Sequence, residues 1–283
     1  MRIIIVCLLI CFTSNVFTQN CDAYKGHGEI KKYEACKKQK EAYKFYQFTK
    51  EYQELLDEAI QIDSTYDNAY WAKSIAYLKS GDFLSWKPLI DKAVELNPQM
   101  HLGYRGWCRY QFFRDYKGAI SDIEEYERII KDDIGYCQNG DYHLLIAKAI
   151  CYKAIGEKDK AIKIIEDYLK DNDEESDLYN YYHLGVLYFE RGDYNKALSN
   201  LEKQKESNNL ADNRYYMAMC YKKMNNTNKY KETILEAKKL FEEGYLLNDP
   251  YTHHYDKVYL SQIEEEINKS KDLILKLLNQ NHV

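Results

Sequence analysis

Apolar side chains recur along most of the chain at the three- and four-residue spacing of amphipathic helices, and the predicted helices come in pairs. The clearest pair spans residues 178–201. Tyr181 and Leu184 fall on one face of its first helix, and Leu201 falls on the inward face of its second. Gly192 begins the turn between them. The pattern therefore predicts a helical hairpin at this place.

This hairpin recurs in weaker copies with a period of about 34 residues, which is typical of helix-turn-helix solenoids. The predicted copies span about 33–65, 67–99, 100–131, 142–173, 178–209 and 211–243. The third copy has a register that is ambiguous by one residue between its two helices. We therefore expect its turn to carry an insertion.

The segments outside the repeats have their own character. Residues 1–19 read as a secretory signal peptide, because Met1-Arg2 supplies a positive end and Ile3 to Phe12 form an apolar run. That run is too short to span a bilayer as a helix, and no other stretch is apolar enough to do so. The sequence predicts a protein that is secreted or periplasmic. An uncleaved anchor, or a lipid anchor on Cys21, is the weaker alternative, because Gln19-Asn20 stand where small residues precede a lipid-modified cysteine.

The rest of the chain divides into an N-terminal arm, a repeat array and a C-terminal capping helix, at residues 20–32, 33–245 and 246–283. The capping helix is expected from about Asp256 to Gln280, where apolar residues recur at helical spacing. A solenoid end leaves one apolar face uncovered, and an added helix with one polar side covers it.

Composition narrows the choice of function. The chain is 30% charged with a net charge of −5, so it lacks the basic footprint of a nucleic-acid-binding protein. Tyrosine is unusually frequent, with 29 residues. No C-x-x-C pair occurs, which argues against a zinc or redox site, and no cofactor or metal is predicted. Cys21 and Cys36 are close enough in sequence for a local disulfide that pins the arm.

The repeats resemble the tetratricopeptide repeat (TPR) family over about 33–243. That family places small residues at the eighth, twentieth and twenty-seventh positions of each repeat and a glycine at the end of the first helix. The residues that match are Gly81, Ala93, Ala119, Ala149, Gly156, Ala161, Gly185, Gly192, Ala197, Ala218 and Ala237, together with Ala59. The departures are Tyr52, Trp86 and Tyr230 at the twentieth position and Lys40 and Ser74 at the eighth. The resemblance implies an all-α, right-handed helical-repeat solenoid of about six units.

The resemblance also implies binding by a concave face, lined by first helices at their second, fifth, ninth, twelfth and thirteenth positions. The candidate residues on that face are Trp71, Ile75, Arg105, Ile146, Ile150, Tyr182, Val186, Phe189, Tyr215 and Met219. This set is largely apolar and aromatic, so it does not fit a clamp for a peptide carboxylate. The alternative is that these residues are ordinary core, or are covered by the protein's own C-terminal segment or a second copy.

The function favoured by these patterns is a non-enzymatic scaffold for a protein or peptide partner. A carbohydrate-binding module that stacks sugars on tyrosines and Trp71 is the alternative. No catalytic fingerprint is present, so an enzyme would need a site assembled only in space. His253-His254 beside Asp256 could bind a metal, but adjacent histidines rarely point to one ion.

Overall fold

The computed structural model describes residues 20–172 and 178–269. The predicted signal peptide and the last part of the predicted capping helix lie outside the described residues. Two compact units divide the chain at Asn97 and Pro98. The described residues are organised as helical hairpins, so the predicted all-α fold is confirmed.

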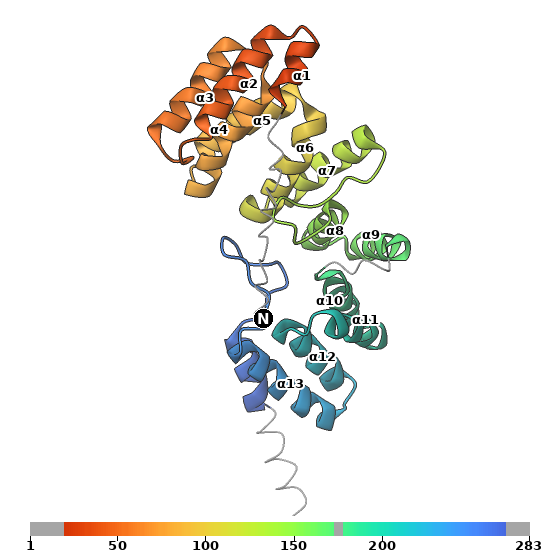
Figure 1. The fold of residues 1–283 in the computed structure, drawn as a ribbon. Helices are drawn as coiled ribbons and strands as arrows, with labels where there is room; N and C mark the ends of the chain where they lie inside the picture. Colours follow the sequence, from red (N-terminus) through yellow and green to blue (C-terminus); the bar gives the residue numbers. More distant parts are fainter. Residues whose placement is uncertain (1–19, 173–177, 270–283) are drawn as a thin grey trace, which may run out of the picture. The chain divides into compact units, whose positions relative to one another are not determined.

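Unit 1 contains two hairpins and a short N-terminal helix. Its elements are α1 (Cys21–Gly26), α2 (Ile30–Ala42), α3 (Lys50–Ile62), α4 (Asp67–Ser80) and α5 (Phe83–Leu96) (Figure 1). The predicted arm at 20–32 thus contains a helix, and a Cys21–Cys36 disulfide joins α1 to α2 with the Cα atoms 5.6 Å apart. Ala59 and Tyr66 pack against this disulfide, which ties the first helix to the core of unit 1.

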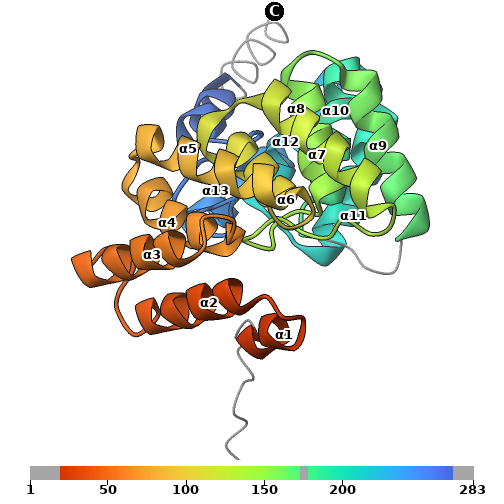
Figure 2. The same ribbon diagram turned by 90° about the horizontal axis from the view of Figure 1, so that it is seen from above.

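Unit 2 contains the other four hairpins of the described chain. Its elements are α6 (Pro98–Cys108), η1 (Arg109–Phe113), α7 (Tyr116–Ile130), α8 (Leu144–Ala154), α9 (Lys158–Asp171), α10 (Asn180–Arg191), α11 (Tyr194–Ser207), α12 (Ala211–Lys223) and α13 (Thr227–Glu242). Each helix packs on the next one along the chain, as Figure 2 shows for α6 to α11.

A π-helical turn explains the ambiguous register of the third repeat. Helix α6 continues into η1, and a π-turn adds one residue relative to an α-helix. The chain then leaves the helix through Arg114, whose φ of 55° lies in the left-handed region. The extra residue therefore lies within the last turn of the first helix, whereas the register shift predicted it in the turn between the two helices.

Small side chains allow the two helices of a hairpin to approach closely. An added Cβ at Gly185 would lie 2.6 Å from Leu201 Cγ, which is closer than packed atoms can come. The alanines named from the repeat pattern have no solvent-exposed surface, at positions 59, 93, 119, 149, 161, 197, 218 and 237. Gly81, Gly156 and Gly192 end or follow first helices with φ of 77°, 90° and 86°, a conformation that glycine adopts without strain.

The chain after α13 departs from the predicted helix. Residues 245–259, named the strap here, are not helical, and the next helix runs from Leu260 through residue 269 of the described chain. The predicted start near Asp256 is wrong because the backbone groups there bond to side chains of α10 and α12 instead. Val258 N–H donates to Asp212 Oδ1, and the Asp256 carbonyl accepts the Tyr182 hydroxyl.

The helix that starts at Leu260 packs on the sixth repeat. Ile263 and Ile267 join a core cluster with Ala218 of α12 and Ile234 of α13. Glu266 accepts the Tyr230 hydroxyl at 2.9 Å and pairs with Lys222. This contact covers the apolar face that the last repeat would otherwise expose.

Candidate functional site

The strap is held in unit 2 by residues at the repeat positions that the TPR resemblance assigns to a concave face. Asp212 stands at the second position of its repeat, Tyr182 at the fifth, and Gln111 and Lys153 at the twelfth. Each of the four donates to or accepts a hydrogen bond from the strap. Unit 2 therefore binds an extended segment of its own chain on this face.

Asp212, in the first turn of α12, binds the strap backbone at two points. Its carboxylate accepts the N–H of Leu247 at 2.8 Å and that of Val258 at 2.6 Å. Beside it, Ala211 N–H donates to the Tyr245 carbonyl at 2.8 Å. Leu247 and Val258 are buried, so these bonds satisfy strap amides that have lost contact with water.

The third repeat holds the middle of the strap. Gln111 donates from Nε2 to Thr252 Oγ1 at 2.7 Å, and its side chain is also 3.4 Å from Asp249. Arg114 donates to the carbonyl of His253. Arg114 directly follows η1, so the residues at the end of this π-helical turn hold the middle of the strap.

A buried polar network surrounds Asp256. Its carboxylate lies 2.5 Å from Lys153 Nζ through Oδ1 and 2.7 Å from His183 Nδ1 through Oδ2. The Tyr142 hydroxyl lies 3.0 Å from His183 Nε2 and 2.9 Å from His254 Nδ1. The network thus links Asp256 to Lys153 of α8 and His183 of α10, and it links His254 to Tyr142, which precedes α8.

Electrostatics in this network keep Asp256 ionised. Burial by itself would raise the pKa of Asp256, but the Lys153 ammonium and the His183 hydrogen bond lower it to about 2. An ionised carboxylate can only accept, so His183 Nδ1 carries the proton in the bond to Asp256. The second nitrogen of His183 faces the Tyr142 hydroxyl.

His254 is held as a neutral ring. Burial lowers the pKa of His254 to about 4, and the neighbouring His183 acts in the same direction. Burial also acts on Asp212, whose pKa it raises. The hydrogen bonds from the N–H groups of Val258 and Leu247 act in the opposite direction and lower that pKa. The strap thus offers an ionised carboxylate, a neutral imidazole and two buried main-chain amides among the groups that hold it in place.

The order Tyr142–His183–Asp256 has the residue types of a proton relay. Tyr142, His183 and Asp256 are 1%, 0% and 6% exposed, so a substrate cannot reach them while the strap is in place. The Tyr142 hydroxyl, both ring nitrogens of His183 and the Asp256 carboxylate are each hydrogen-bonded to another member of the network. The arrangement therefore acts as a fastening for the strap.

The predicted concave-face residues differ in burial between the two units. In unit 2, Ile146, Ile150, Tyr182 and Val186 are fully buried, and Met219 is 8% exposed. Tyr182 contacts the strap directly through its hydroxyl. Covering by the protein's own C-terminal segment, one of the alternatives left open above, thus applies to Tyr182.

The remaining predicted residues are partly exposed. Phe189 and Tyr215 pack against the core cluster of the sixth repeat in unit 2. In unit 1, Trp71 and Ile75 are half-buried on α4, and Trp71 packs against the cluster of Ala42 and Tyr52.

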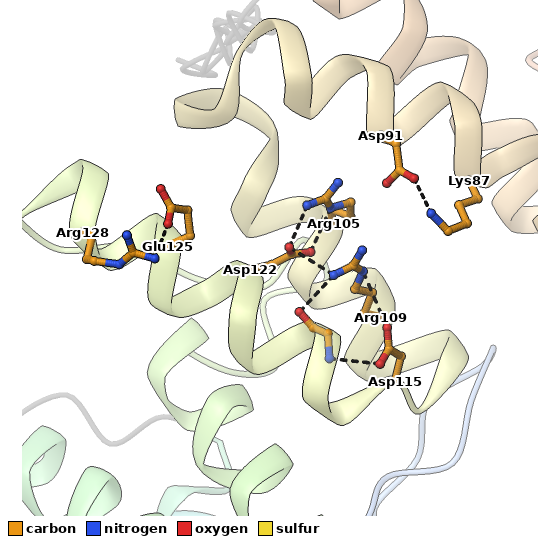
Figure 3. A network of polar contacts seen from close by, with 9 residues as sticks. Lys87, Asp91, Arg105, Arg109, Asp115, Asp122, Glu125 and Arg128 are labelled. Atoms are coloured by element: carbon orange, nitrogen blue, oxygen red, sulfur yellow. Dashed lines mark hydrogen bonds and ion pairs between the residues drawn. The ribbon is translucent and has the colours of Figure 1, made fainter.

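Arg105 has a structural contact that its predicted role did not anticipate. Its guanidinium makes a double hydrogen bond to the buried carboxylate of Asp122, at 2.9 and 2.8 Å (Figure 3). Arg109 also reaches Asp122, at 3.2 Å, and donates to the Gly118 carbonyl. These bonds tie α6 and η1 to α7, so Arg105 braces the third hairpin.

Sequence reasoning missed most of the strap contacts. Lys153 and Asp212 stand at concave positions of the repeat, and that was the available signal. His254 and Asp256 were noted only as a weak metal candidate. Among the described residues, no group of three or more His, Cys, Asp or Glu side chains is arranged to hold a metal ion. None of the described helices is both long and apolar enough to cross a membrane.

Comparisons with known proteins agree with this fold. A family model described as anaphase-promoting complex, cyclosome, subunit 3 matches residues 154–239. No curated protein matches the chain. PilW, a widely conserved type IV pilus biogenesis factor, is similar with a TM-score of 0.53 and 13% identity, over 80% of this chain and 92% of its own.

Two further solved structures have the same arrangement. YrrB, described as a TPR protein with an unusual peptide-binding site, gives a TM-score of 0.52 and 18% identity, over 66% of this chain and 93% of its own. PilF of Pseudomonas aeruginosa gives a TM-score of 0.54 and 13% identity, over 80% of this chain and 90% of its own. At these identities the likeness concerns the fold alone, and it confirms the predicted TPR-like helical solenoid.

Proposed function

We propose that the protein is a non-enzymatic scaffold that binds an extended protein segment outside the cytoplasm. One observation carries the proposal. Unit 2 already holds an extended segment, the strap, with side chains from the repeat positions that resemble a TPR concave face. The same positions in unit 1 would bind a segment of another protein.

Unit 1 is the better candidate for the partner because the strap occupies unit 2. Leu247 and Val258 of the strap are 0% and 1% exposed, which is the burial of a permanent core element. In unit 1, Trp71 at the fifth position and Ile75 at the ninth keep part of their side chains exposed. Aromatic and branched apolar side chains give a large contact area for a bound segment.

The extracellular location has two supports. The N-terminal residues have the pattern of a secretory signal, and the Cys21–Cys36 disulfide requires an oxidising compartment to persist. The buried state of the Tyr142–His183–Asp256 network supports a non-enzymatic role, since a substrate would have to displace the strap to reach it.

A photo-crosslinking residue at position 75 tests the binding surface directly. The full chain carrying benzoylphenylalanine in place of Ile75 is irradiated in extract from its native compartment, and captured proteins are identified by mass spectrometry. Leu235, an exposed apolar residue on α13 that is 56% exposed, carries the same group in the control protein. Enrichment of one protein at position 75 alone is expected.

A second measurement tests whether the captured partner binds specifically through Trp71 and Ile75. The crosslinked segment of the partner is made as a peptide, and its affinity is measured by calorimetry for wild type and for Trp71→Ala and Ile75→Ser. We expect each substitution to weaken binding about tenfold or more, as for a central aromatic or apolar contact. Equal capture at positions 75 and 235, or unchanged peptide affinity in both variants, would contradict the proposal.

A further inference from the structure

The turn between α2 and α3 exposes a cluster of aromatic side chains. The exposed fractions of Tyr43, Phe45, Tyr46 and Phe48 are 51%, 43%, 68% and 45%. Tyr43 is partly used by the fold, since it stacks on Tyr52 and accepts a hydrogen bond from Gln39. Tyr46 and Phe48 instead contact each other, with ring centroids 5.4 Å apart, and neither belongs to the core clusters of unit 1.

A second apolar turn lies at the same edge of unit 1. At the start of α5, directly after the turn at Gly81, the chain exposes Leu84 by 90% and Phe83 by 39%. Helices α2 and α4 are the first helices of consecutive hairpins and contact each other, so they run in the same direction. Their C-terminal turns therefore lie at one end of the pair, as both views of the ribbon show (Figures 1 and 2).

The first turn is also locally basic in an acidic protein. Residues 37–50 contain five lysines, Lys37, Lys38, Lys40, Lys44 and Lys50, against the single acidic residue Glu41. Two of the five are paired with carboxylates: Lys38 with Glu41 and Glu58, and Lys50 with Glu54. The whole chain has a net charge of −5. Lys44 lies between the exposed rings and is itself exposed. Exposed apolar side chains and a lysine that lies between them, Lys44, thus occur together at this edge of unit 1.

We infer that this edge, formed by the 43–49 and 83–84 turns, docks on the surface of an anionic phospholipid membrane. Aromatic rings settle at the level of the lipid head groups, where the apolar body and a polar tip are both satisfied. Lysines beside them are attracted to anionic head groups. The inference is independent of the partner surface proposed for Trp71 and Ile75, which belong to the middle of α4.

The shape of the edge favours a membrane over a protein partner. Tyr46 and Leu84 are more than half exposed, at 68% and 90%. Tyr46 stands on the connection between α2 and α3, and Leu84 stands in the first turn of α5. Such protruding tips enter the soft head-group layer without a matching pocket. A protein partner would instead need a cavity shaped for each of the two turns.

Vesicle flotation of the full mature chain tests the inference. The protein is mixed with vesicles of phosphatidylcholine alone, or of phosphatidylcholine with about a third phosphatidylglycerol, which supplies anionic head groups. We expect flotation with the anionic vesicles and a strong decrease in high salt. The variant Tyr46→Ser/Phe48→Ser/Leu84→Ser should lose about tenfold or more of the bound fraction.

A matched control removes the same kind of side chain elsewhere. Tyr251→Ser/Leu235→Ser changes two exposed residues of unit 2, which are 70% and 56% exposed, and should float like wild type. In a separate protein, Tyr46→Trp should gain fluorescence quenching by brominated lipids relative to wild type. The quenching measures insertion of residue 46 into the lipid layer while an aromatic side chain is kept at that position.

Three results would overturn the inference. Wild type that floats with neither vesicle, a triple variant that floats like wild type, or Tyr46→Trp without added quenching would each exclude a membrane contact at this edge. A triple variant that changes the oligomeric state by light scattering, with no effect on flotation, would assign the edge to a second copy of the chain instead.

Discussion

Lys153 Nζ lies 2.5 Å from Asp256 Oδ1, and the two side chains are 2% and 4% exposed although the residues are 103 positions apart in sequence. Lys153 belongs to α8 and Asp256 to the strap. Burying two charges costs free energy that their attraction must offset. The pair is therefore costly to break by removing one partner, and this makes it a sensitive probe of strap attachment.

Removal of the Asp256 carboxylate should strongly destabilise the protein. We expect Asp256→Ala to lower the free energy of unfolding by about 3–5 kcal/mol, because it leaves the Lys153 ammonium buried beside Glu190 alone. The measurement is urea unfolding of the full chain. As a control, Asp159→Ala removes a carboxylate with an 89% exposed side chain that pairs with Arg191, and it should change stability by about 0.5 kcal/mol or less.

A double-mutant cycle isolates the ion pair from other effects of the substitution. Lys153→Met combined with Asp256→Ala should cost less than the two single changes added together, with a coupling of about 0.5–3 kcal/mol. Strict additivity of the two substitutions would show that the pair does not fasten the strap.

His254 should make stability depend on pH between about 4 and 6.5. Burial and His183 lower its pKa from 6.5 to about 4 in the folded protein, while Lys257 acts in the same direction and Asp249 opposes it. As pH falls through this window, the unfolded chain takes up a proton that the folded chain does not. Folded stability is therefore complete above pH 6.5 and declines toward pH 4, by up to roughly 3 kcal/mol.

The neighbouring histidine provides the control for this pH effect. His254→Asn should flatten the decline in stability between pH 6.5 and 4, because the titrating ring is gone. His253→Asn changes an exposed histidine one residue away and should keep the decline. Thermal unfolding at several pH values measures both, and parallel curves for the two variants would refute the assignment.

Hydrogen exchange can report on the strap alone. Asp212 accepts the amides of Leu247 and Val258 through its two carboxylate oxygens. In Asp212→Asn one acceptor becomes a donor that faces an N–H group, so we expect exchange at one or both amides to accelerate about tenfold or more. Asp193→Asn, which keeps the cap that Asp193 forms on Lys196 N–H, should leave these amides unchanged. Equal rates in wild type and Asp212→Asn would argue against this anchor.

The repeat array could be predicted because its determinants are local and periodic. The small or apolar residue types of Gly185, Ala197 and Leu201 recur at the same positions in other copies of the repeat. Each of these residues packs within a single hairpin. Even the π-turn of η1 left a trace as a register shift of one residue. Long-range pairs leave no such trace, since nothing in the sequence near Asp256 points to Lys153.

The strap escaped prediction for the same physical reason. Val258, Ile263 and Ile267 have helical spacing, and this favoured a helix from Asp256 onward. The first of them is instead fixed by Asp212, whose carboxylate offers its amide a partner outside any helix. Apolar spacing reports which residues are buried, but it does not report whether the backbone amides find partners within the segment or elsewhere.

Gly185 should tolerate no side chain. An added Cβ would lie 2.6 Å from Leu201 Cγ and 3.3 Å from the Ala197 carbonyl oxygen, so α10 and α11 would have to separate. We expect Gly185→Ala to lower the free energy of unfolding by about 1–3 kcal/mol, despite the better helix propensity of alanine. Gly26→Ala, where the added Cβ meets nothing within 4 Å, should be close to neutral.

A smaller side chain at position 201 shows whether Gly185→Ala destabilises the protein by overpacking or through the backbone of Gly185. Leu201→Ala alone opens a cavity and costs about 2–5 kcal/mol. Combined with Gly185→Ala it should cost less than the sum of the two, since the smaller side chain makes room for the new methyl group. Gly185 itself is in ordinary helical conformation within α10, so a strain in φ cannot explain a loss of stability. If the double variant is as unstable as the sum, the close approach of α10 and α11 does not depend on this glycine.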